Sequence, residues 1–133
     1  MVKYLVNQGD TLEEWTKRGI VLALEKALKG QEVLLIVPQF HNIDGSPLSR
    51  VLPKAQFPGL YRGNRVFAME DLTLRLYSEQ TVPSNLWNRV VVGLWLAPST
   101  LQKLEVSNPS ILIGVPNFSS ELDSWGAGAT VIS

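Results

Sequence analysis

The sequence contains no cysteine and only one histidine. The lack of cysteine excludes disulfide bonds, thiolate metal sites and a cysteine nucleophile. A single histidine also excludes a metal site built on a pair of histidines. No apolar run approaches the roughly 20 residues that a membrane-spanning helix needs, and the first residues lack the basic and then apolar order of a signal peptide. We therefore expect a soluble, cytoplasmic protein that does not contact a membrane.

The chain has no excess of charge of either sign, because 12 basic residues balance 12 acidic ones. Hydrophobic residues make up 45% of the 133 residues and charged residues 18%, which is typical of a globular chain and not of a disordered one. A chain of this length can bury a core of its own. We expect a single domain over residues 1–133.

Motifs that carry a recognisable chemistry are also missing. There is no G-x-x-x-x-G-K-[ST] run to cradle a phosphate and no G-x-S-x-G nucleophile turn. The turn at 7–11 has one glycine where a dinucleotide-binding fingerprint needs three. The sequence therefore predicts no cofactor and no metal, and it favours a protein that is not an enzyme.

The first 38 residues predict a strand–helix–strand unit with parallel strands. An apolar strand at 3–6 precedes a helix over 11–29, and Thr11 and Glu14 have the spacing of a capping box at its start. Gly30 is the residue type that ends a helix in a left-handed turn. The following run, 33–37, is apolar on both faces, which indicates a central parallel strand.

In the middle of the chain, the pattern of apolar residues changes to that of short turns and antiparallel strands. A proline after a serine predicts a short helical turn over 46–52. A glycine–asparagine pair predicts a hairpin between 60–62 and 65–69. Glu70 and Asp71 predict a second turn. Strict alternation of apolar and polar residues then predicts a strand over 72–77, with a helix over 70–79 as the alternative.

The last third returns to alternating strands and helices. The pattern predicts strands at 89–96, 111–115 and 130–132, with helices over 100–106 and 119–125. The fold class that follows is three-layer α/β, with a mainly parallel sheet of about five strands and helices on its faces. A short antiparallel hairpin or meander is inserted near 60–78.

The predicted first helix is apolar over more of its circumference than one sheet face requires. Its middle, Ile20 to Leu24, is a run of five apolar residues, whereas a helix on a sheet needs a stripe only about 100° wide. Either another helix of this chain or a second copy of the chain must cover the remaining surface. Flanking by another helix is the more ordinary arrangement.

The only histidine follows the predicted central strand. His41 lies just past the carboxyl end of that strand, where ligands bind in open α/β sheets. Asp44 can orient an imidazole, and His41 would then act as a general base. The alternative is a loop histidine beside an aspartate–glycine turn.

Polar residues follow four of the predicted strands. They are Asn7, Gln8 and Thr11 after the first strand, Gln39 and His41 after the second, Ser99 and Thr100 after the third, and Asn117, Ser119 and Ser120 after the fourth. Hydroxyls and amides near helix starts form a plausible site for a small anionic ligand such as a phosphate or a carboxylate. The alternative is that these residues only cap helices.

The segment 50–89 holds five of the six arginines and has a net charge of +3. Arg62, Arg65, Arg75 and Tyr77 are its candidates for contacts with nucleic acid, because cationic side chains bind phosphates and aromatic rings stack on bases. This charge is modest for a nucleic-acid-binding domain. Arginines on the wet face of a sheet are the commoner explanation.

These observations favour a non-catalytic binding or interaction module that acts through the predicted meander and the first helix. Its partner would be another protein or a second copy of the chain. Two alternatives stay open. One is a small-ligand or nucleotide-binding protein or enzyme with its site at the carboxyl ends of the parallel strands. The other is a weak nucleic-acid binder that uses the segment 50–89.

Overall fold

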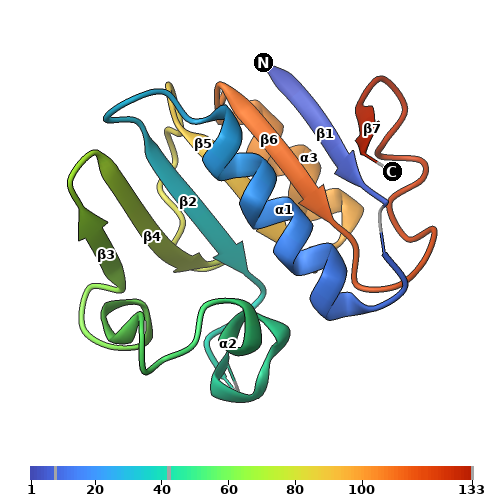
Figure 1. The fold of residues 1–133 in the computed structure, drawn as a ribbon. Helices are drawn as coiled ribbons and strands as arrows, with labels where there is room; N and C mark the ends of the chain where they lie inside the picture. The colour runs from blue at the N-terminus through green and yellow to red at the C-terminus, as the bar shows by residue number, and fades with distance from the viewer. Residues whose placement is uncertain (8, 42, 133) are drawn as a thin grey trace.

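The computed structural model describes residues 1–7, 9–41 and 43–132. A seven-stranded sheet lies between helices on both faces, which confirms the three-layer α/β class (Figure 1). The helices are α1 (Leu12–Lys26), α2 (Pro47–Val51) and α3 (Pro98–Val106), with 3-10 turns η1 (Ile43–Gly45) and η2 (Pro58–Tyr61). The strands are β1 (Val2–Val6), β2 (Glu32–Val37), β3 (Val66–Met69), β4 (Leu72–Ser78), β5 (Val90–Leu94), β6 (Ile111–Val115) and β7 (Thr130–Ile132).

The strands follow the order β3-β4-β2-β5-β6-β1-β7 across the sheet. Among the strands described, only β3 and β4 pair antiparallel, and the other neighbours are parallel. The predicted insertion belongs to the main sheet, because β4 pairs along the whole of β2. That pairing raises the sheet from about five strands to seven.

The connections between the parallel strands cover the two faces in a regular way. The connections that follow β1 and β2 both run towards the side of the sheet where β3 lies. They contain α1 and α2, which pack into one core cluster on one face of the sheet. Those after β4, β5 and β6 lead towards the β7 edge, and Leu86, Leu101 and Leu122 on them pack into a second cluster. Right-handed crossovers require this division.

Strand β2 is central, as its apolar run predicts. The side chains of Val33, Leu35 and Val37 pack into the cluster under α1. Its even-numbered side chains, Leu34 and Ile36, pack into the cluster under α3. All five are fully buried, since helical layers cover both faces of the strand.

Helix α1 begins as predicted and ends earlier. The Thr11 hydroxyl accepts a bond from the Glu14 amide at 3.1 Å, as in a capping box. The Glu14 carboxylate accepts its bond from the Asp10 amide, at 2.9 Å, one residue before the amide that a capping box uses. The helix ends at Lys26, because Ala27 already has extended backbone angles. Gly30 has the expected positive φ but lies in the loop beyond the helix.

The predicted hairpin between 60–62 and 65–69 is wrong. Leu60 and Tyr61 belong to the 3-10 turn η2, and both are buried in the cluster under α1. The Tyr61 hydroxyl donates to the Leu52 carbonyl, which fixes the turn against α2. The second predicted turn, at 70–71, is confirmed, because it joins β3 to β4 in an antiparallel hairpin. The segment 70–79 therefore contains a strand and not the alternative helix.

The helix predicted over 119–125 is also wrong, because this stretch consists of turns. Ser120 has a φ of 66°, which a residue inside a right-handed helix cannot adopt. The Glu121 carboxylate instead accepts a bond from the Asn117 amide at 2.8 Å. Burial of Leu122 and Trp125 holds the turns on the sheet.

The wide apolar face of α1 is covered at one end only. Near its start, Trp15 shares a core cluster with Leu48 of α2, and Glu13 pairs with Arg50 of α2 at 3.2 Å. Near its other end, Leu24 remains 39% exposed. A helix of the same chain therefore accounts for part of the apolar surplus and leaves the rest open.

We expect Gly19→Ala to destabilise the protein although alanine favours helices. A methyl group at Gly19 would lie 2.4 Å from Val115 Cγ2 on β6. Overpacking costs about 1–3 kcal/mol, against a helix-propensity gain of about 1 kcal/mol. With a mid-range cost of about 2 kcal/mol, urea denaturation should show a net loss of about 1 kcal/mol in the free energy of unfolding.

The matched control is Gly45→Ala, where an added methyl group would meet nothing within 4 Å. It should change the free energy of unfolding by less than about 0.5 kcal/mol. A Gly19→Ala protein as stable as the wild type would contradict the close helix–sheet approach.

Candidate functional site

The carboxyl ends of the parallel strands lie along one edge of the sheet, as the sequence predicts. We call it the carboxyl edge, to distinguish it from the side edges formed by β3 and β7. The predicted polar residues, however, follow the neighbouring strands β2, β5, β6 and β1. At about 4.8 Å per strand, the first and last of these are roughly 14 Å apart. The residues therefore do not form one site for a small ligand.

Two crevices divide this edge. The connections after β2 and β5 leave towards opposite faces, and so do those after β6 and β1. Each such reversal opens a crevice in which ligands of α/β proteins bind.

The crevice between β2 and β5 contains a hollow of about 190 Å³. Its lining consists of Pro38, Gln39, His41, Ile43, Ser46 and Trp95. Gln39 and His41 are thus brought together, as predicted. Sequence reasoning missed Trp95 as a residue of this site. The sequence pattern places it inside an apolar strand, whereas the structure places it just beyond β5. A tryptophan at the end of an apolar run is its only sequence signal.

Trp95 is held firmly in this crevice. Its indole Nε1 donates to Thr16 Oγ1 at 2.9 Å, and the Thr16 hydroxyl donates to the Leu12 carbonyl at 2.7 Å. The Trp95 amide donates to the Val115 carbonyl at 2.9 Å. The ring is therefore anchored to both α1 and β6.

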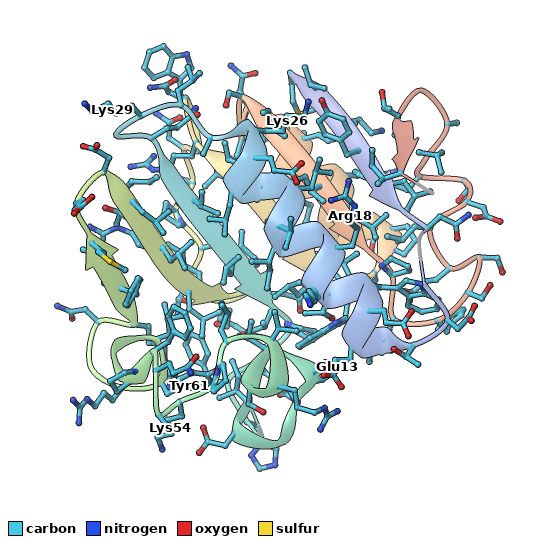
Figure 2. The ribbon with its side chains drawn as sticks, viewed as in Figure 1. Glu13, Arg18, Lys26, Lys29, Lys54 and Tyr61 are labelled. Atoms are coloured by element: carbon cyan, nitrogen blue, oxygen red, sulfur yellow. The ribbon has the colours of Figure 1, made fainter. Side chains whose placement is uncertain are left out.

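His41 and Asp44 are not brought together. Asp44 lines a different hollow of about 500 Å³ with Tyr61 and pairs with Lys54 at 3.5 Å. Lys54 and Tyr61 lie below the sheet in Figure 2. Burial, together with the Asp44 charge, raises the pKa of Tyr61 to about 12, so the phenol stays protonated at neutral pH. The Asp44 carboxylate therefore pairs with a lysine, and the proposed pairing of His41 with Asp44 is not seen in the described structure.

The candidates that follow β1, near the crevice between β6 and β1, make contacts within the fold. Thr11 caps α1. The main-chain amide of the exposed Asn7 donates to the Ile132 carbonyl at 2.8 Å, which extends the pairing of β1 with β7. Gln8 lies outside the described residues. These contacts favour the capping interpretation of Thr11 over the ligand site.

The remaining polar candidates lie on the α3 side of this edge. Ser99 and Thr100 belong to the first turn of α3, which Ala97 and not a serine precedes. Ser119 is exposed, and its carbonyl accepts a bond from the Ser120 hydroxyl at 2.6 Å. They do not converge with Gln39 and His41, because α3 packs against the opposite face from α1.

The candidate nucleic-acid residues do not share a surface. Arg65 lies 3.9 Å from the Phe40 ring centre, and Phe40 packs on the α1 side of the sheet. Arg75 and Tyr77 alternate with Leu74 and Leu76 of that side, so they project from the other face. Arg62 is exposed in the turn before β3.

Arg75 is also paired with a carboxylate, which it shares with Arg89. Its Nε donates to Glu32 at 2.5 Å, and Arg89 Nε donates to the other oxygen of the same carboxylate at 3.0 Å. Partial burial alone would raise the pKa of Glu32, but the bonds and charges of both arginines together lower it. The bond to Glu32 raises the pKa of Arg75. Glu32 therefore offsets one positive charge of the segment 50–89.

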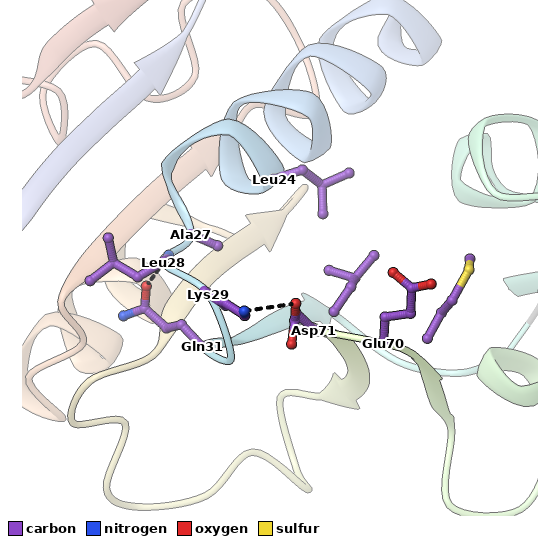
Figure 3. Close-up of a pocket in the computed structure, with 9 residues that line it drawn as sticks. Leu24, Ala27, Leu28, Lys29, Gln31, Glu70 and Asp71 are labelled. Atoms are coloured by element: carbon purple, nitrogen blue, oxygen red, sulfur yellow. Dashed lines mark hydrogen bonds and ion pairs between the residues drawn. The ribbon is translucent and has the colours of Figure 1, made fainter.

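A groove at the opposite end of α1 is the second candidate site (Figure 3). This helix–hairpin groove has a volume of about 420 Å³. Its lining consists of Leu24, Ala27, Leu28, Lys29, Gln31, Met69, Glu70, Asp71 and Leu72. Leu28 is 72% exposed and Met69 is 58% exposed. The groove joins the end of the first helix to the hairpin, the two elements through which the sequence predicts an interaction.

Gln31 fixes the loop that presents Leu28. Its side-chain oxygen accepts a bond from the Leu28 amide at 2.9 Å. Its side-chain nitrogen donates to the Asn88 carbonyl at 2.9 Å and to the Ser110 hydroxyl at 3.0 Å. The exposed leucine is therefore presented on an ordered loop.

No protein-family model, curated protein or solved structure matches this chain. Within 1–7, 9–41 and 43–132, no group of three or more histidine, aspartate or glutamate side chains is placed to hold a metal ion. No helix of the described part is both long and apolar enough to cross a membrane.

We expect Glu32→Gln to remove a pH-dependent contribution to stability. The folded-state pKa of Glu32 lies below the ordinary value of 4.5, so the carboxylate stabilises the fold above that pH. This stabilisation is lost as the pH falls through the lower folded-state value. At pH 7 the variant should lose about 1 kcal/mol, a value reduced for partial exposure.

Urea denaturation of both proteins at about pH 7 and pH 3 measures this difference, which should shrink on acidification. Glu70→Gln, which changes an exposed carboxylate in the β3–β4 turn, is the control and should alter stability less. An equal loss at both pH values would show that the effect is not caused by the carboxylate charge.

Proposed function

We propose that this protein is an interaction module that binds a second copy of itself through the helix–hairpin groove. The observation that supports this proposal is the apolar surface around the groove, where Leu24, Leu28 and Met69 are 39%, 72% and 58% exposed. Exposed apolar patches with polar rims are typical of protein–protein contacts. The polar rim here consists of Lys29, Glu70 and Asp71.

The ordered loop favours binding. Since Gln31 already fixes the main chain at Leu28, little conformational freedom remains to be lost there on association. Preorganised side chains bind more tightly for the same buried area.

The surface offers both protruding and hollow parts, as a two-fold contact between identical chains requires. Trp87 is 66% exposed beside a neighbouring hollow of about 310 Å³, and Gln31 lines both that hollow and the groove. Large apolar side chains therefore stand next to concave surface at the same end of the sheet. Tryptophan is among the residues that contribute most to such interfaces.

The charges at the rim are compatible with self-association. Lys29 and Asp71 pair at 3.7 Å, and their side chains are 83% and 62% exposed. An ion pair this exposed contributes little to stability. Lys29 can therefore exchange its partner for the second copy's Asp71 at little cost, and the reverse pair forms by symmetry. The chain carries no net charge that would oppose the approach of two copies.

We expect Leu28→Glu and Met69→Glu to weaken dimerisation. Each places a charge in the apolar contact, which should raise the dimer dissociation constant at least about tenfold, or about 1.4 kcal/mol. Light scattering after size-exclusion chromatography, over a range of concentrations, measures the mass of the wild-type chain and of each variant.

The matched control is Phe118→Glu, because Phe118 is 58% exposed in the turns that follow the carboxyl end of β6, whereas the groove adjoins the starts of β2 and β4. It should leave dimerisation unchanged. A wild-type chain that stays monomeric at hundreds of micromolar would overturn the proposal, as would a Phe118→Glu variant that dissociates as readily as Leu28→Glu. Binding of only an apolar segment from a different protein would also count against a second copy as the occupant.

A further inference from the structure

We infer that the hollow between β2 and β5 binds a neutral, planar ligand of one ring, such as a pyrimidine base or a pyridine carboxamide. This site lies at the carboxyl end of the sheet, whereas the helix–hairpin groove adjoins the starts of β2 and β4. The inference is therefore independent of the proposed self-association.

The size of the hollow limits the ligand. Its volume is about 190 Å³. Sites for drug-sized ligands measure about 300–1,000 Å³, whereas a cavity of about 150 Å³ binds benzene. The hollow is too small for a dinucleotide and suits one substituted ring.

Trp95 gives the hollow a fixed aromatic wall. Its backbone has a φ of 61°, a conformation that bulky residues rarely adopt. Strain of this kind persists only where surrounding contacts enforce it, and it gathers at ligand sites. Those contacts are the bonds of Trp95 to Thr16 and Val115, at 2.9 Å each. An aromatic ring already held in position suits a planar ligand, which can stack on it.

The polar lining indicates a neutral ligand with both a donor and an acceptor. Among the residues that the structure describes, the lining contains no aspartate, glutamate, lysine or arginine, and the imidazole of His41 is its one titratable group. Gln39 offers an amide that can donate and accept. The Ser46 hydroxyl donates to the Ile43 carbonyl at 2.7 Å, so its oxygen can still accept from a ligand.

Four charged residues on the neighbouring segments form two ion pairs. Asp44 pairs with Lys54 at 3.5 Å, and Glu13 pairs with Arg50 at 3.2 Å. A charged ligand would therefore meet no uncompensated partner among these four residues. A lactam or carboxamide group, in contrast, matches the glutamine amide in a reciprocal pair of hydrogen bonds.

Nitrogen–proton correlation spectra of the full chain provide the test. The four tryptophans give separate indole signals, and Trp95→Phe identifies the one from Trp95. Uracil and nicotinamide are the neutral probes, and benzoate is a charged ring of similar size. We expect uracil or nicotinamide to shift the Trp95 indole signal in a saturable way with a dissociation constant of about 1 mM or lower, and benzoate to bind at least about fivefold more weakly.

Gln39→Ala should weaken binding at least about fivefold, whereas Gln102→Ala, at an exposed glutamine of α3, should not change it. If Trp95→Phe does not fold, the Trp95 signal is assigned by removing the other tryptophans one at a time. Leu28→Glu should bind the probe normally, which separates this inference from the dimer.

Three outcomes would overturn the inference. In the first, neither neutral probe moves the Trp95 signal at about 10 mM. In the second, the exposed Trp87 indole shifts equally and without saturation, which indicates unspecific stacking. In the third, Gln39→Ala binds as tightly as the wild type.

Discussion

The packing of α1 across β5 and β6 is the constraint on which the rest of the structure depends. The chain leaves β1 near one edge and must reach β2 three positions away, so its helix crosses the two strands between them (Figure 1). Gly19 allows this close approach, since a side chain there would meet Val115. Because one helix occupies the centre of the face, the surface beside it must be covered by other segments or stay open.

The surface beside α1 is covered at the start of the helix and partly open at its end. At its start, α2 and the loops after β2 pack against it, and they form the crevice that contains Gln39, His41 and Trp95. At its end lies the helix–hairpin groove, where Leu28 and Met69 are exposed. A single topological feature thus produces both surfaces, a small hollow at one end of the helix and a larger groove at the other.

The elements that sequence reasoning predicted well are those whose signals are local. The Thr11 and Glu14 capping residues, the apolar run of β2 and the alternation of β4 each depend on neighbours within a few residues. The prediction failed at 60–62 and 119–125, where local turn and cap signals were overridden. There, burial of Tyr61 and Trp125 against distant parts of the chain decides the backbone conformation.

The sequence by itself determined the α/β class, the start of α1, the central place of β2 and the edge at which His41 and Gln39 lie. Only the tertiary structure decided the strand order, and with it the division of the polar residues between two crevices. It also placed Trp95 against Thr16 and Gln31 against Ser110, each pair 79 residues apart in the chain. Contacts at such separations depend on how the strands assemble, which the periodicity of short segments does not encode.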